Sequence, residues 1–153
     1  MSLLKCEVIT AAADRKSLSI NGSCVCGAIE FEAELIPGMV FNCHCSRCRK
    51  SHGAAFATQA FARRETLRFI RGKEHLREYD STGGIRAFCS HCGSRLMNFA
   101  KDGGDYLSIA LACVDSAHDA KPVADVCVNS KVDWQPLSDT IPSYPELPDD
   151  IAE

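Results

Sequence analysis

The sequence lacks any apolar run approaching the roughly 20 residues of a membrane-spanning helix. Its opening stretch, MSLLKCEVITAAADRK, scatters charges instead of placing them ahead of an apolar core, which is not the pattern of a secretory signal. We therefore expect a soluble, cytoplasmic protein with no membrane partner, and we expect residues 1–16 to be partly disordered.

Blocks of like charge are also missing. The 153 residues include 17 Lys plus Arg and 20 Asp plus Glu, a formal net charge of −3. A basic patch is the usual electrostatic footprint of nucleic-acid binding, so the composition gives no support for a nucleic-acid partner. A chain of this length also buries roughly 70% of the surface that its unfolded form exposes, so no metal is needed merely to make it compact.

Extended helical periodicity is missing as well, because no segment shows three clean turns of it. Instead AIEFEAE (28–34) alternates, with Ile29, Phe31 and Ala33 on one side, as in a half-buried strand. Weaker versions of this pattern occur at 67–72, 76–81 and 85–90, and a more continuous apolar run at 106–114 predicts a central strand. The best helical candidate is SRCRKSHG at 46–53.

These patterns predict a mainly β fold, a single domain of twisted antiparallel sheets with few short helices. We place a zinc-binding β domain at 17–136, followed by an extended Pro-rich tail at 137–153. Trp134, the single tryptophan, is expected to pack and anchor that tail.

Cysteine is abundant, with ten in the chain, at positions 6, 24, 26, 43, 45, 48, 89, 92, 113 and 127. Disulfide frameworks belong mostly to secreted chains under about 80 residues. Closely spaced pairs, by contrast, present two sulfurs to one ion easily. We therefore interpret the two densest groups as metal ligands, and Cys113 and Cys127 as small core residues.

The first group joins Cys24 and Cys26, in NGSCVCGAIEF, to Cys89 and Cys92, in FCSHCGSRL. Each pair is followed at once by glycine, which suits a tight turn whose backbone amides point at the bound sulfurs. Two such turns predict a closed tetrahedral four-cysteine zinc site, around which the fold is built. Such a site is structural.

The second group, Cys43, Cys45 and Cys48 in CHCSRCRK, offers three sulfurs from one loop. A fourth ligand could come from His44, His52, another cysteine or a molecule that is not protein. His44, between two ligating positions, is expected to point away from the ion, either beside the ligands or at the surface. An open fourth position is the pattern of catalytic zinc, whereas closure by His52 would make the site structural.

The ligand set narrows the chemistry of this second site. Three thiolates make it anionic overall, so a zinc ion there would be a weaker Lewis acid and a poorer activator of water than one held by histidines. It suits a fourth ligand that is itself a thiol, kept as a nucleophilic thiolate. Arg47, Arg49 and Ser51 are the candidates for binding substrate and stabilising an alkoxide.

Together the motifs resemble the glutathione-dependent formaldehyde-activating enzymes, a family that includes centromere protein V. The resemblance runs through residues 22–32, 43–56, 88–96 and 122–146. It implies a structural zinc on the first group and a second, more labile zinc on the other. It also implies a carbon-sulfur lyase that joins the thiol of glutathione to formaldehyde, giving S-hydroxymethylglutathione. Relatives often have histidine where this chain has Asp125.

Two other interpretations of the second group stay open. One is a non-catalytic two-zinc binding or interaction module in which the site is closed by a protein side chain. The other is a redox or metal sensor that oxidises to a disulfide when zinc is lost.

Overall fold

The structure, a computed structural model, describes residues 18–149, so the expectation for residues 1–16 lies outside the described residues. The described chain divides into two compact units. The sheet unit comprises residues 18–36 and 60–119, and the helix unit comprises residues 37–59 and 120–149. Two strands, β2 (Glu30–Cys43) and β3 (Ala57–Arg63), contribute residues to both units.

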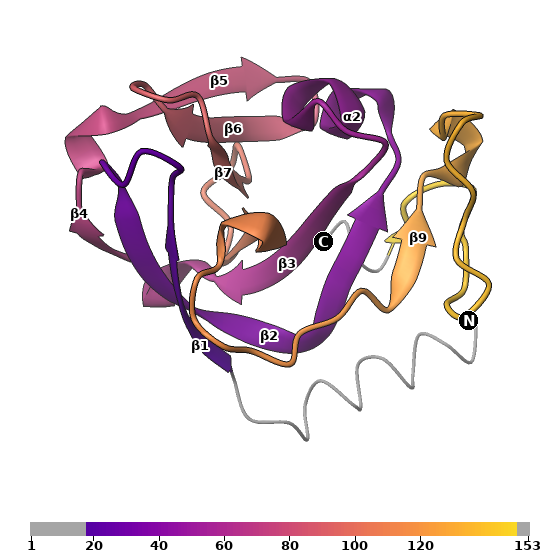
Figure 1. The fold of residues 1–153 in the computed structure, drawn as a ribbon, viewed down its shortest axis with the longest axis horizontal. Coiled ribbons are helices and arrows are strands. Elements are labelled where there is room, and N and C mark those ends of the chain that lie inside the picture. The colour runs from indigo at the N-terminus through magenta and orange to yellow at the C-terminus, as the bar shows by residue number, and fades with distance from the viewer. Residues whose placement is uncertain (1–17, 150–153) are drawn as a thin grey trace. The chain divides into compact units, whose positions relative to one another are not determined.

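The sheet unit is built from antiparallel strands in the order β1-β2-β3-β8-β7-β6-β5, with β4 beside β2. Figure 1 shows β5, β6 and β7 following one another at one end of this order. Besides β2 and β3, its strands are β1 (Leu18–Ser23), β4 (Arg68–Arg71), β5 (Leu76–Ser81), β6 (Gly84–Cys89), β7 (Arg95–Phe99) and β8 (Tyr106–Ala110). The mainly β antiparallel fold is therefore as predicted.

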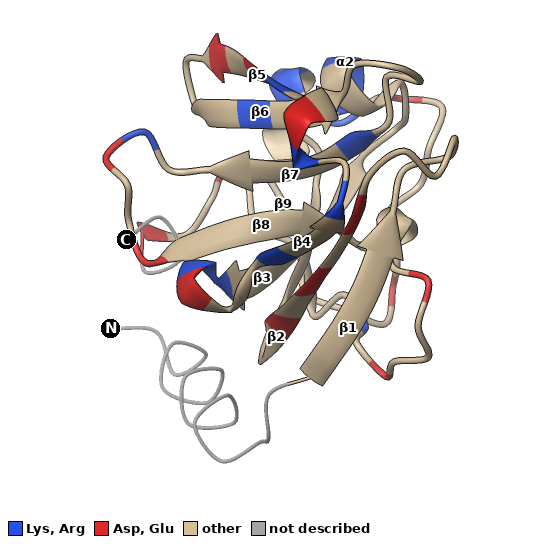
Figure 2. Cartoon of the chain, turned by 90° about the vertical axis from the view of Figure 1, so that its left-hand side faces the viewer, with Lys and Arg blue, Asp and Glu red and all other residues tan. Residues whose placement is uncertain are grey.

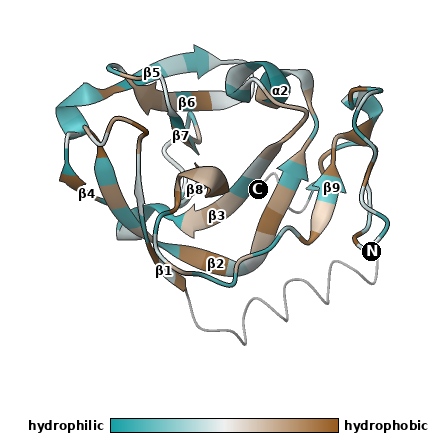
Figure 3. Ribbon diagram, viewed as in Figure 1, coloured by the Kyte–Doolittle hydropathy of each residue, from teal (hydrophilic) through white to brown (hydrophobic). Residues whose placement is uncertain are grey.

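The first half of β2 shows why this sequence forms a sheet. Phe31, Ala33 and Leu35 are buried, whereas Glu34 between them is exposed. Figure 3 shows the alternation as hydrophobic and hydrophilic bands along β2. Burying each large apolar side chain of this face contributes roughly 1.5–3 kcal/mol. The strand predicted from AIEFEAE is confirmed.

The other face of β2 carries charge. Glu32 pairs with Arg68 of β4, and Glu30 pairs with Arg71 at 3.0 Å. Figure 2 shows the acidic bands of β2 and the basic residues of the neighbouring strand. These pairs are partly exposed, so they stabilise the register of β4 against β2 only weakly.

The remaining strand predictions are confirmed at β4, β5 and β6. The run at 106–114 is a strand only as far as Ala110, because Leu111–Cys113 turns into a 3-10 helix. The strands β1, β3 and β7 were not predicted, although β1 does alternate, with Ile20 and Gly22 buried and Ser19 and Asn21 exposed. None of the helices within residues 18–149 has the length and hydropathy that a membrane span requires.

The helix unit contains the helix α2 (Ser46–His52) and the short strand β9 (Ala124–Val126). Cys45 caps the N-terminus of α2, and Gly53, with φ 60, ends it in the left-handed conformation. The helix predicted at 46–53 is confirmed. In the same unit β9 pairs in parallel with the end of β2, so that Cys43 lies opposite Val126 (Figure 1).

The C-terminal segment is anchored to β9 by its backbone. Residues 137–148 form neither helix nor strand apart from an isolated bridge between Ser143 and Asp125. The backbone N–H of Asp125 donates to the carbonyl of Pro142 at 2.9 Å, and that of Tyr144 donates to the carbonyl of Asp125 at 2.9 Å. Trp134 is 71% exposed, so the expectation that it packs was wrong. The domain boundaries at 17 and 136 stay a prediction.

Candidate metal centres

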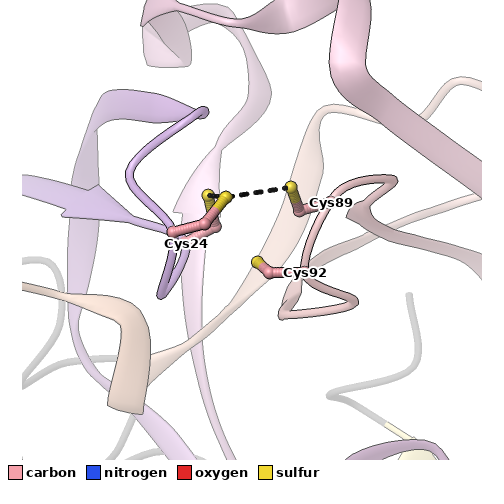
Figure 4. Close-up of side chains that lie close together, drawn as sticks. Cys24, Cys89 and Cys92 are labelled. Atoms are coloured by element: carbon pink, nitrogen blue, oxygen red, sulfur yellow. Dashed lines mark hydrogen bonds between the residues drawn. The ribbon is translucent and has the colours of Figure 1, made fainter.

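The first cysteine group assembles from two loops of the sheet unit. Cys24 and Cys26 lie between β1 and β2, Cys89 ends β6, and Cys92 lies in the turn before β7. All four sulfurs lie within 4.8 Å of one another (Figure 4). The distances are 3.6 Å from Cys24 to Cys26 and 3.9 Å from Cys26 to Cys89. A tetrahedron with metal–sulfur bonds of about 2.3 Å has edges of about 3.8 Å, so these sulfurs fit one zinc ion.

Glycine shapes both of these loops. Gly27 and Gly93 have φ values of 76° and 77°, which favour glycine over other residues. In these turns the N–H of Gly27 donates to the carbonyl of Cys24 at 3.0 Å, and that of Gly93 to the carbonyl of Cys89 at 2.8 Å. The loops thereby turn their paired sulfurs to the same side.

Hydrogen bonds to sulfur favour the thiolate form that a metal requires. The backbone N–H of Ile29 donates to the sulfur of Cys24 at 3.2 Å. The hydroxyl of Ser94 lies 3.2 Å from the sulfur of Cys92 and lowers the pKa of that thiol to about 5. The same hydroxyl oxygen accepts from the N–H of Val25 at 3.0 Å, which ties the two loops together. These donors fit a site for a cation with four anionic ligands.

The second cysteine group lies where β2 ends and α2 begins. The sulfurs of Cys43, Cys45 and Cys48 lie within 4.8 Å of one another. The sulfur of Cys45 accepts from the N–H of Cys48 at 3.3 Å, the capping bond of α2. Contact with the Cys43 and Cys48 thiols lowers the pKa of Cys45, and contact with the Cys45 and Cys48 thiols raises the pKa of Cys43. The three residues could hold one metal ion.

Neither nearby histidine joins this second group. His52 Nε2 lies 3.0 Å from Gln59 Nε2, and His44 Nε2 lies 2.8 Å from Asp125 Oδ1. Among residues 18–149, the side chains whose ligand atoms converge within 4.8 Å at this place are the three cysteines alone. The geometry thus leaves a metal ion here with three protein ligands.

A fourth thiol nevertheless lies close by. Cys127 follows β9 directly, and its thiol contacts that of Cys43. Burial raises the pKa of the Cys127 thiol and outweighs the contact with Cys43, which lowers that pKa. Its backbone φ of 58° is the one positive value at a non-glycine residue among those described. Cys127 is half-buried, as is Cys113, whose thiol donates to the carbonyl of Arg95 at 3.0 Å. Both were expected to be small core residues rather than ligands. Both are only half-buried, and neither belongs to the two groups whose ligand atoms converge.

His44 is buried rather than at the surface. Its exposed fraction is 1%, that of Asp125 is 2%, and the ring centroid of Phe56 lies 5.0 Å from that of His44. The pairing of His44 with Asp125 was missed by the sequence analysis. The one signal in the sequence was the family resemblance, which implies a histidine at the position of Asp125, but it did not identify His44 as the partner.

The three candidate substrate residues all lie on α2 but differ in their environments. Arg47 is exposed, and its charge favours the thiolate of Cys45. Arg49 is half-buried and donates from Nε to the carbonyl of His44 at 3.2 Å. Ser51 is half-buried and has an interaction partner within the chain. Arg47 is therefore the most accessible of the three, and their roles stay predictions.

Comparison with known protein families gives a match over most of the chain. Residues 19–130 match the family described as glutathione-dependent formaldehyde-activating enzyme. This chain belongs to that family. Membership connects it with glutathione- and formaldehyde-related chemistry and agrees with cysteine groups that could hold zinc.

The chain is also similar to a protein of known crystal structure. A Rhodobacter sphaeroides protein of known crystal structure is 31% identical, with a TM-score of 0.56. The alignment covers 65% of this chain and 92% of that one. No curated protein matches this member of the formaldehyde-activating family.

Proposed function

We propose that this chain is a cytoplasmic, zinc-dependent carbon-sulfur lyase of the S-hydroxymethylglutathione synthase type. It would join a thiol, glutathione or a similar molecule, to a small aldehyde such as formaldehyde. The observation that carries the proposal is the convergence of three sulfurs, Cys43, Cys45 and Cys48, with both neighbouring histidines bonded elsewhere. Family membership supports the same substrate class.

A zinc ion on these three cysteines would hold an incoming thiol as thiolate while leaving it nucleophilic. The thiolate sulfur would attack the carbonyl carbon, forming a carbon–sulfur bond while the carbonyl π electrons move to oxygen. The resulting alkoxide would take up the proton that the thiol released, so no other reactant is needed. Arg47, which is exposed and close enough to Cys45 to favour its thiolate, would bind a substrate carboxylate or stabilise the alkoxide.

Exchange NMR between glutathione and formaldehyde, combined with zinc analysis, tests the proposal. We expect the wild-type protein to bind two zinc ions and to accelerate exchange. Cys48→Ser should lose one zinc and the acceleration, whereas Cys113→Ser, which alters a thiol outside both groups, should retain both. Exchange that is no faster with wild type than with Cys48→Ser would refute the proposed enzymatic function.

A second candidate function is favoured by the thiol of Cys127 beside Cys43. If Cys127 moved to complete a four-sulfur site, the chain would be a non-catalytic two-zinc binding module. X-ray absorption separates the two functions. A closed site has sulfur alone around both zinc ions, ignores added thiol, and acquires a lighter ligand in Cys127→Ser. An open site takes up added thiol and is unchanged by Cys127→Ser.

A further inference from the structure

His44 lies between two ligands of the second centre, and its position is set by three hydrogen bonds. Its backbone N–H donates to the carbonyl of Val126 at 3.0 Å. Its carbonyl accepts from Arg49 Nε at 3.2 Å, and its ring nitrogen Nε2 lies 2.8 Å from Asp125 Oδ1. Two of these bonds lead to β9, so this strand holds the residue that separates Cys43 from Cys45.

Asp125 is itself held on a rigid backbone. It pairs with Asn42 of β2 on one side, and its N–H and C=O bond to Pro142 and Tyr144 on the other. A side chain on a strand bonded along both edges has little freedom to follow a moving partner. The carboxylate therefore acts as a fixed acceptor for the imidazole.

Burial makes the hydrogen bond between the side chains of His44 and Asp125 costly to break. His44 and Asp125 are 1% and 2% exposed, and the structure offers no protein partner to His44 Nδ1 or Asp125 Oδ2. A buried pair contributes little net stability over apolar residues, but removing one partner leaves the other polar group unsatisfied. A role in fixing the geometry of the second centre is therefore the hypothesis to test for this pair.

We propose that Asp125 is a positioning residue of the second metal centre, which acts through His44 to keep the sulfurs of Cys43, Cys45 and Cys48 converged on one ion. The inference rests on the proposed metal binding by these three cysteines. Arg49 supports the same loop from α2 through the carbonyl of His44.

The test is the rate at which zinc leaves each centre for a chromophoric chelator, with the four-cysteine centre as internal reference. Asp125→Ala should speed release from the second centre by ~10- to 100-fold, the scale on which loss of an outer hydrogen-bond partner weakens metal sites. Release from the first centre should not change. Asp139→Ala, at an exposed aspartate of the same unit, is the matched control and should match wild type.

A double-variant cycle separates positioning from general stabilisation. If Asp125 acts through His44, then Asp125→Ala combined with His44→Ala should release zinc no faster than the faster of the two single variants. His44→Gln, which places a donor nitrogen near the position of Nε2, should restore part of the retention lost in His44→Ala. Asp125→Asn keeps an acceptor oxygen and should have a smaller effect than Asp125→Ala.

Three results would overturn the proposal: equal release from Asp125→Ala and Asp139→Ala, additive effects in the double variant, or equal acceleration at both centres. If Asp125→Ala does not fold, Asp125→Asn and His44→Gln carry the comparison, since they preserve volume. The readout is separate from activity. Site-selective zinc release without thiol–aldehyde exchange would refute the proposed function and leave the positioning role standing.

Discussion

The sulfur of Cys26 lies 3.9 Å from the sulfur of Cys89, although 63 positions separate the two residues along the chain. A metal ion shared by them would close a long loop and join the β1–β2 connection to the β6–β7 turn. The conformational entropy lost on closing a loop grows only slowly with loop length. Zinc that binds the folded state and not the unfolded chain raises the free energy of unfolding. The first centre is therefore expected to contribute strongly to stability.

Replacing one ligand of this centre should unfold the sheet unit. Zinc binding to structural sites is worth about 10–16 kcal/mol near neutral pH, which is as large as the stability of a whole domain. We expect Cys89→Ser to lose one zinc and its cooperative thermal transition. Zinc analysis and calorimetry check this, with Cys113→Ser as the control that keeps both. A Cys89→Ser protein that melts like wild type would contradict a structural role.

Chelation should remove the two metals in a defined order. The second centre has three protein sulfurs against four in the first, so it should lose its ion first. In a chelator titration followed by zinc release and circular dichroism, the first equivalent should leave while the β signal is unchanged. Loss of β structure in step with the first equivalent would mean that the assignment of the two centres is reversed.

Two glycines of the sheet unit with similar backbone angles should respond very differently to alanine. Gly72 has φ +77° and a Cβ there would lie 1.8 Å from the carbonyl oxygen of Ala28, whereas Gly103 has φ +74° and open space around it. We expect Gly103→Ala to lower the free energy of unfolding by about 1–2 kcal/mol, from backbone strain alone. Gly72→Ala should cost more than about 4 kcal/mol, because backbone must move.

Urea unfolding midpoints measure this difference. Similar midpoints for the two alanine variants would show that the segment around Ala28 yields easily, contrary to the close packing of Gly72 in the structure.

The thiol of Cys113 should make stability depend on alkaline pH. Burial, and then the charge of Asp115, raises its pKa from 9.0 to about 11. Between these values the unfolded chain has lost the proton that the folded chain keeps, so the free energy of unfolding falls as pH rises. One proton limits the slope to about 1.4 kcal/mol per pH unit.

Unfolding of wild type and Cys113→Ala from pH 8 to pH 11 tests this expectation. The two curves of unfolding free energy against pH should differ in slope between pH 9.0 and about 11, and they should run parallel below pH 9.0. Parallel curves throughout would show that the folded environment does not disfavour the thiolate of Cys113.

Some features followed from the sequence because they depend on neighbours along the chain. The alternation at 28–34 predicted which side chains of β2 are buried, and the short helix after Cys45 followed from its local pattern. The cysteine spacings predicted the three-cysteine group and each close pair of the first group, since C-x-C and C-x-x-C bring two sulfurs to one side. That the two pairs of the first group meet depends on the fold, because 63 positions separate Cys26 from Cys89. The family resemblance added the order of these motifs.

Other features depended on contacts between distant segments. The environment of His44 was left open by its sequence position, because Asp125 lies 81 residues away and meets it only when β9 pairs with the end of β2. For the same reason Cys127 was assigned to the core but lies beside Cys43, and Trp134 was expected to pack but is exposed.

The sequence by itself therefore determined the ligand types and which cysteines lie together locally, because metal coordination begins with short spacings that any fold must respect. Only the tertiary structure decided which polar partner each remaining side chain has. Such a partner depends on strand register, and a one-residue shift in register turns a side chain to the opposite face. The pairing of His44 with Asp125 beside the second centre is one of the contacts that only the tertiary structure decided.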